Sequence, residues 1–262
     1  MPAFLEELAT WARKRDDIRA VVLLGSHARA ESPADEHSDV DVVVFADEPD
    51  RYLGDGDWLR RFGEPLLTFV EATPVGGFDE RRVLFLDGLE VDFVVPPSAA
   101  ARATPADAGA VFARGFEVLY DDGIGVAPPP AAPRPVPPTQ ANLDQFSNDF
   151  WYHVLWTAKK LRRGEVLLAK QVCDCRLTAQ IVELARWRAH GSDTWHGLRF
   201  FERWAGDDVV EALRPTFAAY DAEDVARALR AKGELFGRLE EEVAARFGLA
   251  VSVDRGEILR RL

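Results

Sequence analysis

Three aspartates and one Gly-Ser pair are the residues of this sequence best suited to chemistry. Asp39 and Asp41 begin an apolar run and are spaced i and i+2. Residues at this spacing point to the same face of a β-strand, so the two carboxylates are expected side by side at one strand end. Hard divalent cations prefer such oxygen ligands. The alternative is a solvated strand start, but aspartate is depleted within strands and three valines follow Asp41.

The Gly-Ser pair ends an earlier apolar run, residues 18–24. Gly25 lets the backbone approach a ligand closely because it has no side chain. Backbone amides beyond it, together with the Ser26 hydroxyl, can donate hydrogen bonds to phosphate oxygens. Ser26 is therefore a predicted triphosphate contact. Arg29 either reaches a phosphate or pairs with a nearby carboxylate. His27 is interpreted as a surface residue, with a ligand or a base as the alternative.

The third aspartate lies on a predicted hairpin. Two apolar runs, residues 82–86 and 90–95, flank an Asp-Gly pair, which is a strong signal for a tight turn. Asp92 sits deep in the second run, where a solitary charge is costly unless it is compensated. Glu90 is spaced i, i+2 from Asp92 and therefore points to the same face of the strand. It is a candidate substrate contact, and the alternative is a solvated residue at the start of the strand.

The remaining pattern predicts an α+β chain of two domains. The first domain, 1–126, contains the sites above. Residues 127–138 hold seven prolines and predict a stiff linker, because proline continues neither a helix nor a central strand. Residues 139–262 show helical periodicity and predict a helical bundle, with one strand-like run at 249–253. In the first domain we expect helices at 2–16 and 58–62, a helical connection at 98–112, and strands at 18–24, 38–45, 65–70, 82–86, 90–95 and 116–120.

Charge is distributed unevenly between the two halves. Residues 1–125 contain 25 acidic and 12 basic side chains, whereas the remainder contains 19 and 20. A negative surface disfavours nucleic acid and attracts a polycationic small molecule. We see no membrane span and no secretory signal, so we expect a cytoplasmic enzyme, monomeric or homodimeric. The two cysteines, Cys173 and Cys175, fall on different faces of a helix, which predicts neither a disulfide nor a shared metal.

The segment from Gly25 to Phe45, GSHARAESPADEHSDVDVVVF, resembles the nucleotidyltransferase superfamily signature of Gly-Ser, a spacer and Asp-x-Asp at the next strand. This resemblance implies an N-terminal mixed β-sheet of the nucleotidyltransferase type, with flanking helices. It also implies a third carboxylate beside the first pair. Asp92 would then be a further metal ligand or the base that deprotonates the attacking hydroxyl.

The second half resembles aminoglycoside 6-adenylyltransferases, on the runs NDFWY at 148–152 and TAKKLRRGE at 157–165. Lys159 is the candidate phosphate contact there, with an ordinary exposed lysine as the alternative. Glu165 either takes a proton, holds a substrate ammonium or forms a surface pair with Arg162 or Arg163. Trp151 is interpreted as a core residue or as a wall for a cationic substrate.

Together these resemblances imply transfer of AMP from ATP to a hydroxyl of a streptomycin-like aminoglycoside, with release of pyrophosphate. Asp39, Asp41 and Asp92 would hold two Mg²⁺ ions, and Gly25 and Ser26 would contact the β- and γ-phosphates. The alternatives are adenylylation of another small hydroxylated antibiotic, such as a lincosamide, and a nucleotide-binding or antitoxin-like module without turnover.

Overall fold

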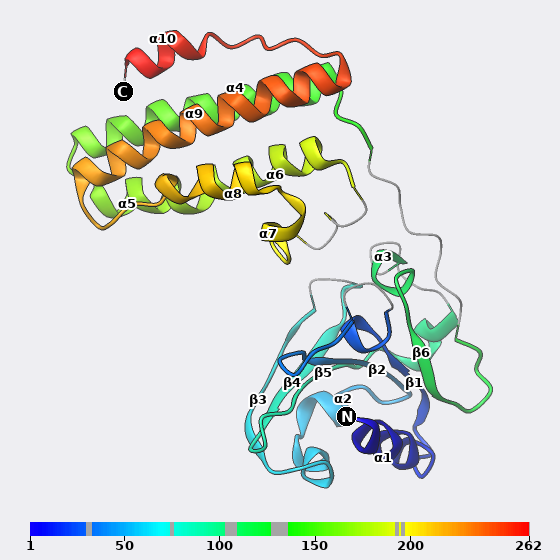
Figure 1. Ribbon diagram of the computed structural model, residues 1–262. Helices are drawn as coiled ribbons and strands as arrows, with labels where there is room; N and C mark the ends of the chain where they lie inside the picture. The colour runs from blue at the N-terminus through cyan, green and yellow to red at the C-terminus, as the bar shows by residue number, and fades with distance from the viewer. Residues whose placement is uncertain are drawn as a thin grey trace. The chain divides into compact units, whose positions relative to one another are not determined.

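The computed structural model describes residues 1–29, 33–73, 76–102, 109–126, 136–191, 194 and 197–261. The chain divides into two compact units, Met1–Pro133 and Arg134–Leu262 (Figure 1). Residues 127–135 of the predicted proline-rich linker lie outside the described residues, as do residues 103–108 of the predicted helical connection. Within the described residues, no helix is both long enough and apolar enough to cross a membrane.

The first unit is built on a six-stranded mixed sheet with the order β3-β4-β5-β2-β1-β6. β2 and β5 are parallel neighbours, and every other pairing is antiparallel. The predicted hairpin is β4 and β5, which pair antiparallel, and β5 also pairs with β2, the strand that contains Asp41. The strands are β1 (Ile18–Leu23), β2 (Val40–Ala46), β3 (Pro65–Ala72), β4 (Asp79–Phe85), β5 (Glu90–Val94) and β6 (Glu117–Asp121).

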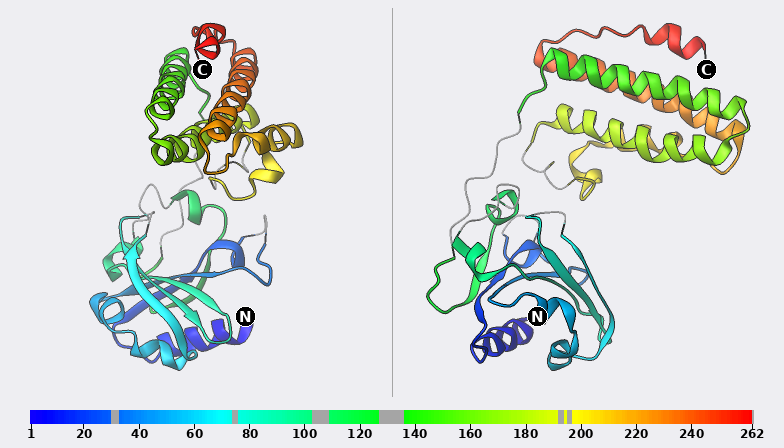
Figure 2. Two further views of the ribbon diagram at one scale, coloured as in Figure 1. Left: turned by 90° about the vertical axis from the view of Figure 1, so that its left-hand side faces the viewer. Right: turned by 180° about the vertical axis from the view of Figure 1, so that it is seen from behind.

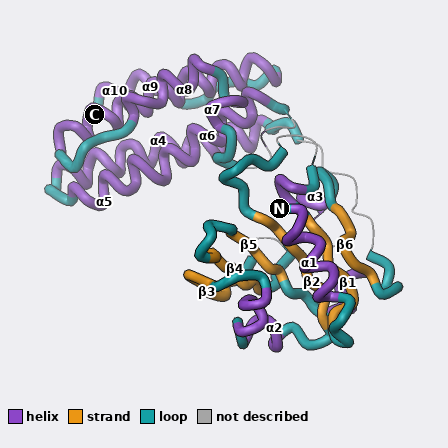
Figure 3. Tube along the Cα trace, turned by 60° about the horizontal axis from the view of Figure 1, so that its bottom comes forward, coloured by secondary structure: helices purple, strands orange, loops and turns teal. Residues whose placement is uncertain are grey.

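Two separate cores cover the two faces of this sheet. Leu8 and Trp11 of α1, with Tyr52 of α2, pack on one face, and α1 runs across the sheet there (Figure 3). Ala101 and Phe112 pack on the other face, against β1 and β2. The helical segments are α1 (Pro2–Ala12), α2 (Asp50–Gly54) and α3 (Gly109–Phe112), with 3₁₀ turns η1 (Gly25–His27), η2 (Asp57–Arg61) and η3 (Ser98–Arg102).

The second unit is helical, as predicted. The long helices α4 and α9 lie side by side (Figure 2). Their termini follow from local sequence. Thr139 and Asn142 form a capping box at the start of α4, Asp221 is the N-cap of α9, and Gly248 is its C-cap with a left-handed backbone. Its elements are α4 (Gln140–Arg162), α5 (Val166–Gln171), the π-helix η4 (Val172–Leu177), α6 (Thr178–Ala189), α7 (Phe201–Trp204), α8 (Asp207–Leu213), η6 (Arg214–Thr216), α9 (Ala222–Phe247) and α10 (Arg255–Arg260).

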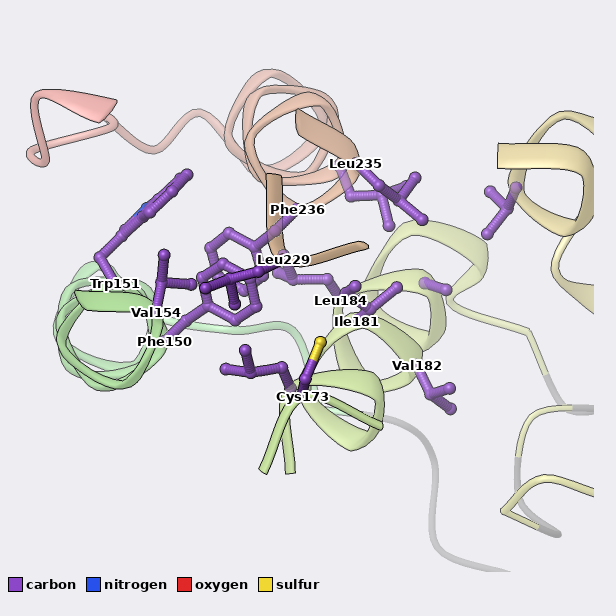
Figure 4. Packing of buried hydrophobic residues seen from close by; sticks show 14 of the residues in the cluster. Phe150, Trp151, Val154, Cys173, Ile181, Val182, Leu184, Leu229, Leu235 and Phe236 are labelled. Carbon is purple, nitrogen blue, oxygen red and sulfur yellow. The ribbon is translucent and has the colours of Figure 1, made fainter. Parts of the chain in front are cut away.

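Aromatic and aliphatic side chains fill the core of the helical unit. The rings of Phe150 and Phe236 stack with their centroids 3.6 Å apart, and Trp151 meets Phe236 edge-on (Figure 4). Cys173 is buried in this core, whereas Cys175 is exposed, and both thiols are free. The two cysteines thus lie on different faces of the helical segment, as expected.

The strand-like run at 249–253 is not a strand in the structure, so that expectation was wrong. Its backbone bonds to a side chain instead: Ala250 N donates to Gln140 Oε1, and Gln140 Nε2 donates to Ala250 O, at 2.9 and 2.8 Å. Without a neighbouring strand, extended residues satisfy their backbone groups through such partners. The first helix is also shorter than predicted, since it ends at Ala12.

Candidate active site

The turn after β1 brings the Gly-Ser pair against the strand that carries Asp41. Gly25 has a left-handed backbone, with φ of +68°, and begins η1. A Cβ at this position would overlap Oδ2 of Asp41 and lie 2.8 Å from its Cγ. Leu24 N also donates a hydrogen bond to the Asp41 carbonyl at 2.9 Å. Only glycine therefore allows this turn to approach the aspartate.

Ser26 follows in the same turn with its hydroxyl buried. Its Oγ has no hydrogen-bond partner among the described residues. A buried hydroxyl without a partner costs free energy, and a phosphate oxygen would provide an acceptor. The orphaned Oγ thus fits the predicted triphosphate contact.

His27 is more deeply placed than predicted. The ring is half-buried, its Nε2 is buried, and no partner for that atom lies within the described part of the chain. Burial lowers the pKa of His27, against the opposing effects of a hydrogen bond to the Ser38 backbone and the charge of Asp39. The interpretation of His27 as a surface residue was wrong, because the turn folds its ring toward the loop before β2.

The structure brings the three aspartates together. Asp39 directly precedes β2, Asp41 lies in β2, and Asp92 lies in β5, where it is the register partner of Asp41. One carboxylate oxygen from each residue lies within 4.8 Å of the others. The parallel pairing of β2 with β5 causes this grouping, since it places two residues 51 positions apart in direct register.

Burial and the neighbouring carboxylates both raise the pKa of Asp92 in this cluster. Burial raises the pKa of Asp92 to about 7, and the charges of Glu80, Asp41 and Asp39 act in the same direction, while Arg82 opposes them. A divalent cation placed among these oxygens would relieve the repulsion and favour the ionised carboxylates. The three side chains therefore fit a site for a hard metal ion such as Mg²⁺.

Sequence analysis did not single out Arg82, which lies beside the aspartate cluster. The Arg82 guanidinium pairs with Asp92 at 3.0 Å, and also with Glu71 at 3.0 Å and Glu80 at 3.1 Å. The sequence shows Arg82 only as a basic residue on the first strand of the predicted hairpin. The register of the two strands is needed to place it opposite Asp92.

Glu90 and Arg29 are the other predicted site residues of the first unit. Glu90 is exposed at the start of β5, two positions from Asp92 and thus on the same face of the strand. Arg29 is half-buried just after η1.

Three predicted residues belong to the helical unit. Lys159 is exposed on α4. Glu165 forms ion pairs with Lys160 at 2.9 Å and with Arg163 at 2.8 Å, which is the surface-pair alternative. Trp151 is 2% exposed, so the interpretation of this residue as a wall for a substrate was wrong. Its ring is enclosed by the helical core and presents no surface to a ligand.

Comparison with known proteins finds relatives that cover most of the chain. A relative from Campylobacter jejuni, an aminoglycoside 6-adenylyltransferase, is 24% identical over 223 residues, covering 79% of this chain and 75% of that protein. The Bacillus subtilis (strain 168) enzyme of the same name is 22% identical over 249 residues, covering 89% and 86%. A crystal structure of an aminoglycoside 6-adenyltransferase from Bacillus subtilis aligns over 98% of this chain and 95% of that one, with 18% identity and a TM-score of 0.46.

The family model described as streptomycin adenylyltransferase matches residues 3–260, which include the Gly-Ser turn, all three aspartates and helices α4 to α10. This match spans nearly the full chain. The protein is therefore a nucleotidyltransferase that belongs to the streptomycin adenylyltransferase family.

Proposed function

We propose that this protein transfers AMP from ATP to a hydroxyl group of an aminoglycoside and releases pyrophosphate. The observation that carries the proposal is the grouping of Asp39, Asp41 and Asp92 beside the Gly25-Ser26 turn. That arrangement combines a site for divalent metal with a donor for phosphate oxygens. The family assignment supports the same reaction class.

Each residue has a defined task in this reaction. Ser26 Oγ donates a hydrogen bond to a phosphate oxygen, and Gly25 allows the triphosphate to approach the turn. Asp39 and Asp41 hold Mg²⁺, and Asp92 either holds Mg²⁺ or accepts the proton of the acceptor hydroxyl. The bound metal supplies charge neutralisation for the triphosphate.

The bond changes balance without a further reactant. The acceptor oxygen attacks the α-phosphorus of ATP, the bond from that phosphorus to the bridging α,β-oxygen breaks, and pyrophosphate leaves. The hydroxyl proton passes to a carboxylate base and then to solvent. Positioning and charge stabilisation provide most of the rate enhancement in such a transfer.

The charge of the chain supports a cationic acceptor. The first 125 residues, which contain the three aspartates, carry 25 acidic and only 12 basic side chains. An aminoglycoside with several ammonium groups is attracted to such a surface, whereas a nucleic acid is repelled. The names of both relatives point to the same class of acceptor. Streptomycin is the specific acceptor that we propose, on the family description.

The test is a reaction of the full chain with ATP, Mg²⁺ and a panel containing streptomycin, other aminoglycosides and lincomycin. Product mass and pyrophosphate release are measured, with the Asp41→Asn variant as the negative control. We expect one AMP added to streptomycin. Addition to lincomycin alone would establish the lincosamide alternative, and ATP binding without pyrophosphate release for any acceptor would establish a module without turnover.

A further inference from the structure

A row of paired residues crosses the sheet at the level of the aspartate cluster. Asp41 of β2 pairs in register with Asp92 of β5, Asp92 pairs with Arg82 of β4, and Arg82 pairs with Phe69 of β3. Residues directly opposite one another on neighbouring strands point to the same face. Arg82 therefore borders the cluster on the side away from the Gly25-Ser26 turn, which follows β1.

The two ends of the Arg82 guanidinium have different partners. Nη2 lies 3.0 Å from Oδ2 of Asp92, whereas Nε lies 3.1 Å from Oε1 of Glu80 and 3.0 Å from Oε1 of Glu71. The guanidinium is planar and rigid, so fixing Nε also fixes the direction in which Nη2 points. Arg82 thus connects Asp92 to two carboxylates that lie outside the cluster.

Glu80 is the buried carboxylate that pairs with Arg82. Its residue is 4% exposed, and Arg82 is its ion-pair partner in the described chain. A buried carboxylate needs such a partner, because an uncompensated buried charge is strongly unfavourable. Glu71 is exposed and contributes less. The need to compensate Glu80 therefore holds Arg82 in place, and Arg82 in turn holds Asp92.

We propose that Arg82 is a positioning residue of the active site: anchored on Glu80, it engages Oδ2 of Asp92 and so orients this carboxylate toward Asp39 and Asp41. The inference rests on the proposed function, in which Asp92 holds metal or accepts the hydroxyl proton. Groups that orient metal-binding side chains in this way commonly affect metal affinity or activity by about 10- to 100-fold.

If Arg82 acted only through its charge, its removal would strengthen metal binding and not weaken it. Removing a positive charge next to Asp92 makes the cluster more negative, which by Coulomb attraction alone strengthens the binding of a divalent cation. Loss of orientation weakens that binding instead. The direction of the change therefore separates the two roles.

The test compares Arg82→Gln, Arg82→Lys and Glu80→Gln with the wild-type chain. Mn²⁺ affinity is measured on nucleotide-free protein by electron paramagnetic resonance, and kcat and KM for ATP are measured separately. We expect Arg82→Gln to weaken Mn²⁺ binding about tenfold and to lower kcat about 10- to 100-fold, with KM for ATP within about twofold. Arg82→Lys should not restore either value, because an ammonium is a single point that cannot span both carboxylates.

Glu80→Gln tests the anchor while Arg82 and Asp92 stay intact. It also makes the site less negative, which by itself weakens cation binding, so kcat is compared at saturating Mg²⁺. We expect kcat to fall there too, since the guanidinium loses its buried partner. The matched control is Arg60→Gln, which removes an exposed arginine paired with Glu64 at 2.6 Å and should leave Mn²⁺ affinity, kcat and KM within about twofold of wild type.

Asp92→Asn separates failure of this inference from failure of the proposed function. If Asp92→Asn retains full turnover and Mn²⁺ affinity, the proposed site itself is wrong. If Asp92→Asn is inactive while Arg82→Gln retains both properties or binds Mn²⁺ more tightly, only the positioning role is overturned. Thermal unfolding of each variant identifies misfolding, and Arg82→Lys, which keeps a charge beside Glu80, then decides the question.

Discussion

Gly25 and Asp41 are so close that any side chain at position 25 would occupy the space of the aspartate carboxylate. The turn that presents Ser26 and the strand that presents Asp41 are therefore positioned as one unit. Leu24 N, bonded to the Asp41 carbonyl at 2.9 Å, joins the same two segments through the backbone. The Gly25-Ser26 turn and the Asp41 carboxylate cannot be separated without disturbing both.

Gly25→Ala tests this relationship. We expect the variant to lose at least about 100-fold in kcat/KM, because the new Cβ displaces the Asp41 carboxylate, and to lose about 1–2 kcal/mol of stability from its left-handed backbone. The control is Gly248→Ala, which has the same φ of +68° but no atom within 4 Å of the added Cβ. Gly248→Ala should show the stability loss alone. Equal activity losses in the two variants would contradict the explanation.

Asp41→Asn and Asp39→Asn test the metal site. Each change removes a charged ligand, so we expect turnover to fall at least about a thousandfold. Neither aspartate is fully buried, and loss of one charge relieves repulsion in the cluster, so the free energy of unfolding should stay within about 1 kcal/mol of wild type. Steady-state kinetics and chemical denaturation measure the two effects. Full turnover in either variant would contradict the assignment of Asp39 and Asp41 to the metal site.

The raised pKa of Asp92 predicts a pH dependence of stability in the metal-free protein. The folded state holds this proton up to about pH 7, whereas the unfolded chain releases it near the ordinary value of 3.8. The folded state binds more protons in this window, so the contribution of Asp92 to stability is present at low pH and is lost as pH rises toward 7. We expect the wild-type free energy of unfolding to fall by about 2 kcal/mol between about pH 5 and pH 7, and Asp92→Asn not to show this fall.

This dependence is measured by urea denaturation in the presence of a chelator. Addition of Mg²⁺ or Mn²⁺ should remove the loss in the wild-type protein, because metal replaces the proton as the group that neutralises the carboxylate. Parallel stability profiles for wild type and Asp92→Asn across this pH range would show that Asp92 titrates normally.

Trp151 is predicted to stabilise the helical unit and not to contact substrate. Trp151→Ala should cost about 3–5 kcal/mol, because it leaves a cavity beside Phe236, whereas Trp151→Phe should cost less and keep KM for the acceptor. The neighbouring Tyr152→Ala is the control, since Tyr152 is 65% exposed and should change stability by no more than about 0.5 kcal/mol. A raised KM with unchanged stability in Trp151→Phe would restore the substrate-wall interpretation.

Two adjacent lysines allow a test of the proposed phosphate contact in the helical unit. Lys160 pairs with Glu165 and lies over the Trp156 ring at 5.0 Å, whereas Lys159 is exposed. If Lys159 contacts the triphosphate, Lys159→Gln should raise KM for ATP about tenfold, and Lys160→Gln should change it less than about twofold. The reverse order would transfer the role to Lys160.

The sequence by itself determined the parts of this protein that depend on local spacing. Asp39 and Asp41 share a face because of the period of a strand, and the change to helical periodicity after residue 139 predicted the second unit correctly. The isolated charge of Asp92 in an apolar run was also visible, because burying a solitary charge is costly. Gly25 was predicted to let a ligand approach the backbone, whereas the structure places the Asp41 carboxylate where its Cβ would lie.

Tertiary structure decided everything that depends on register between distant segments. The parallel pairing of β2 with β5 places Asp92 opposite Asp41, and the β4–β5 register places Arg82 opposite Asp92, with Glu80 as its buried anchor. Spacing along the chain does not encode these pairings, because many registers satisfy the same alternation of apolar residues. Likewise, the sequence left Trp151 as either a core residue or a wall for a cationic substrate, and only the packing of α4 against α9 assigned it to the core.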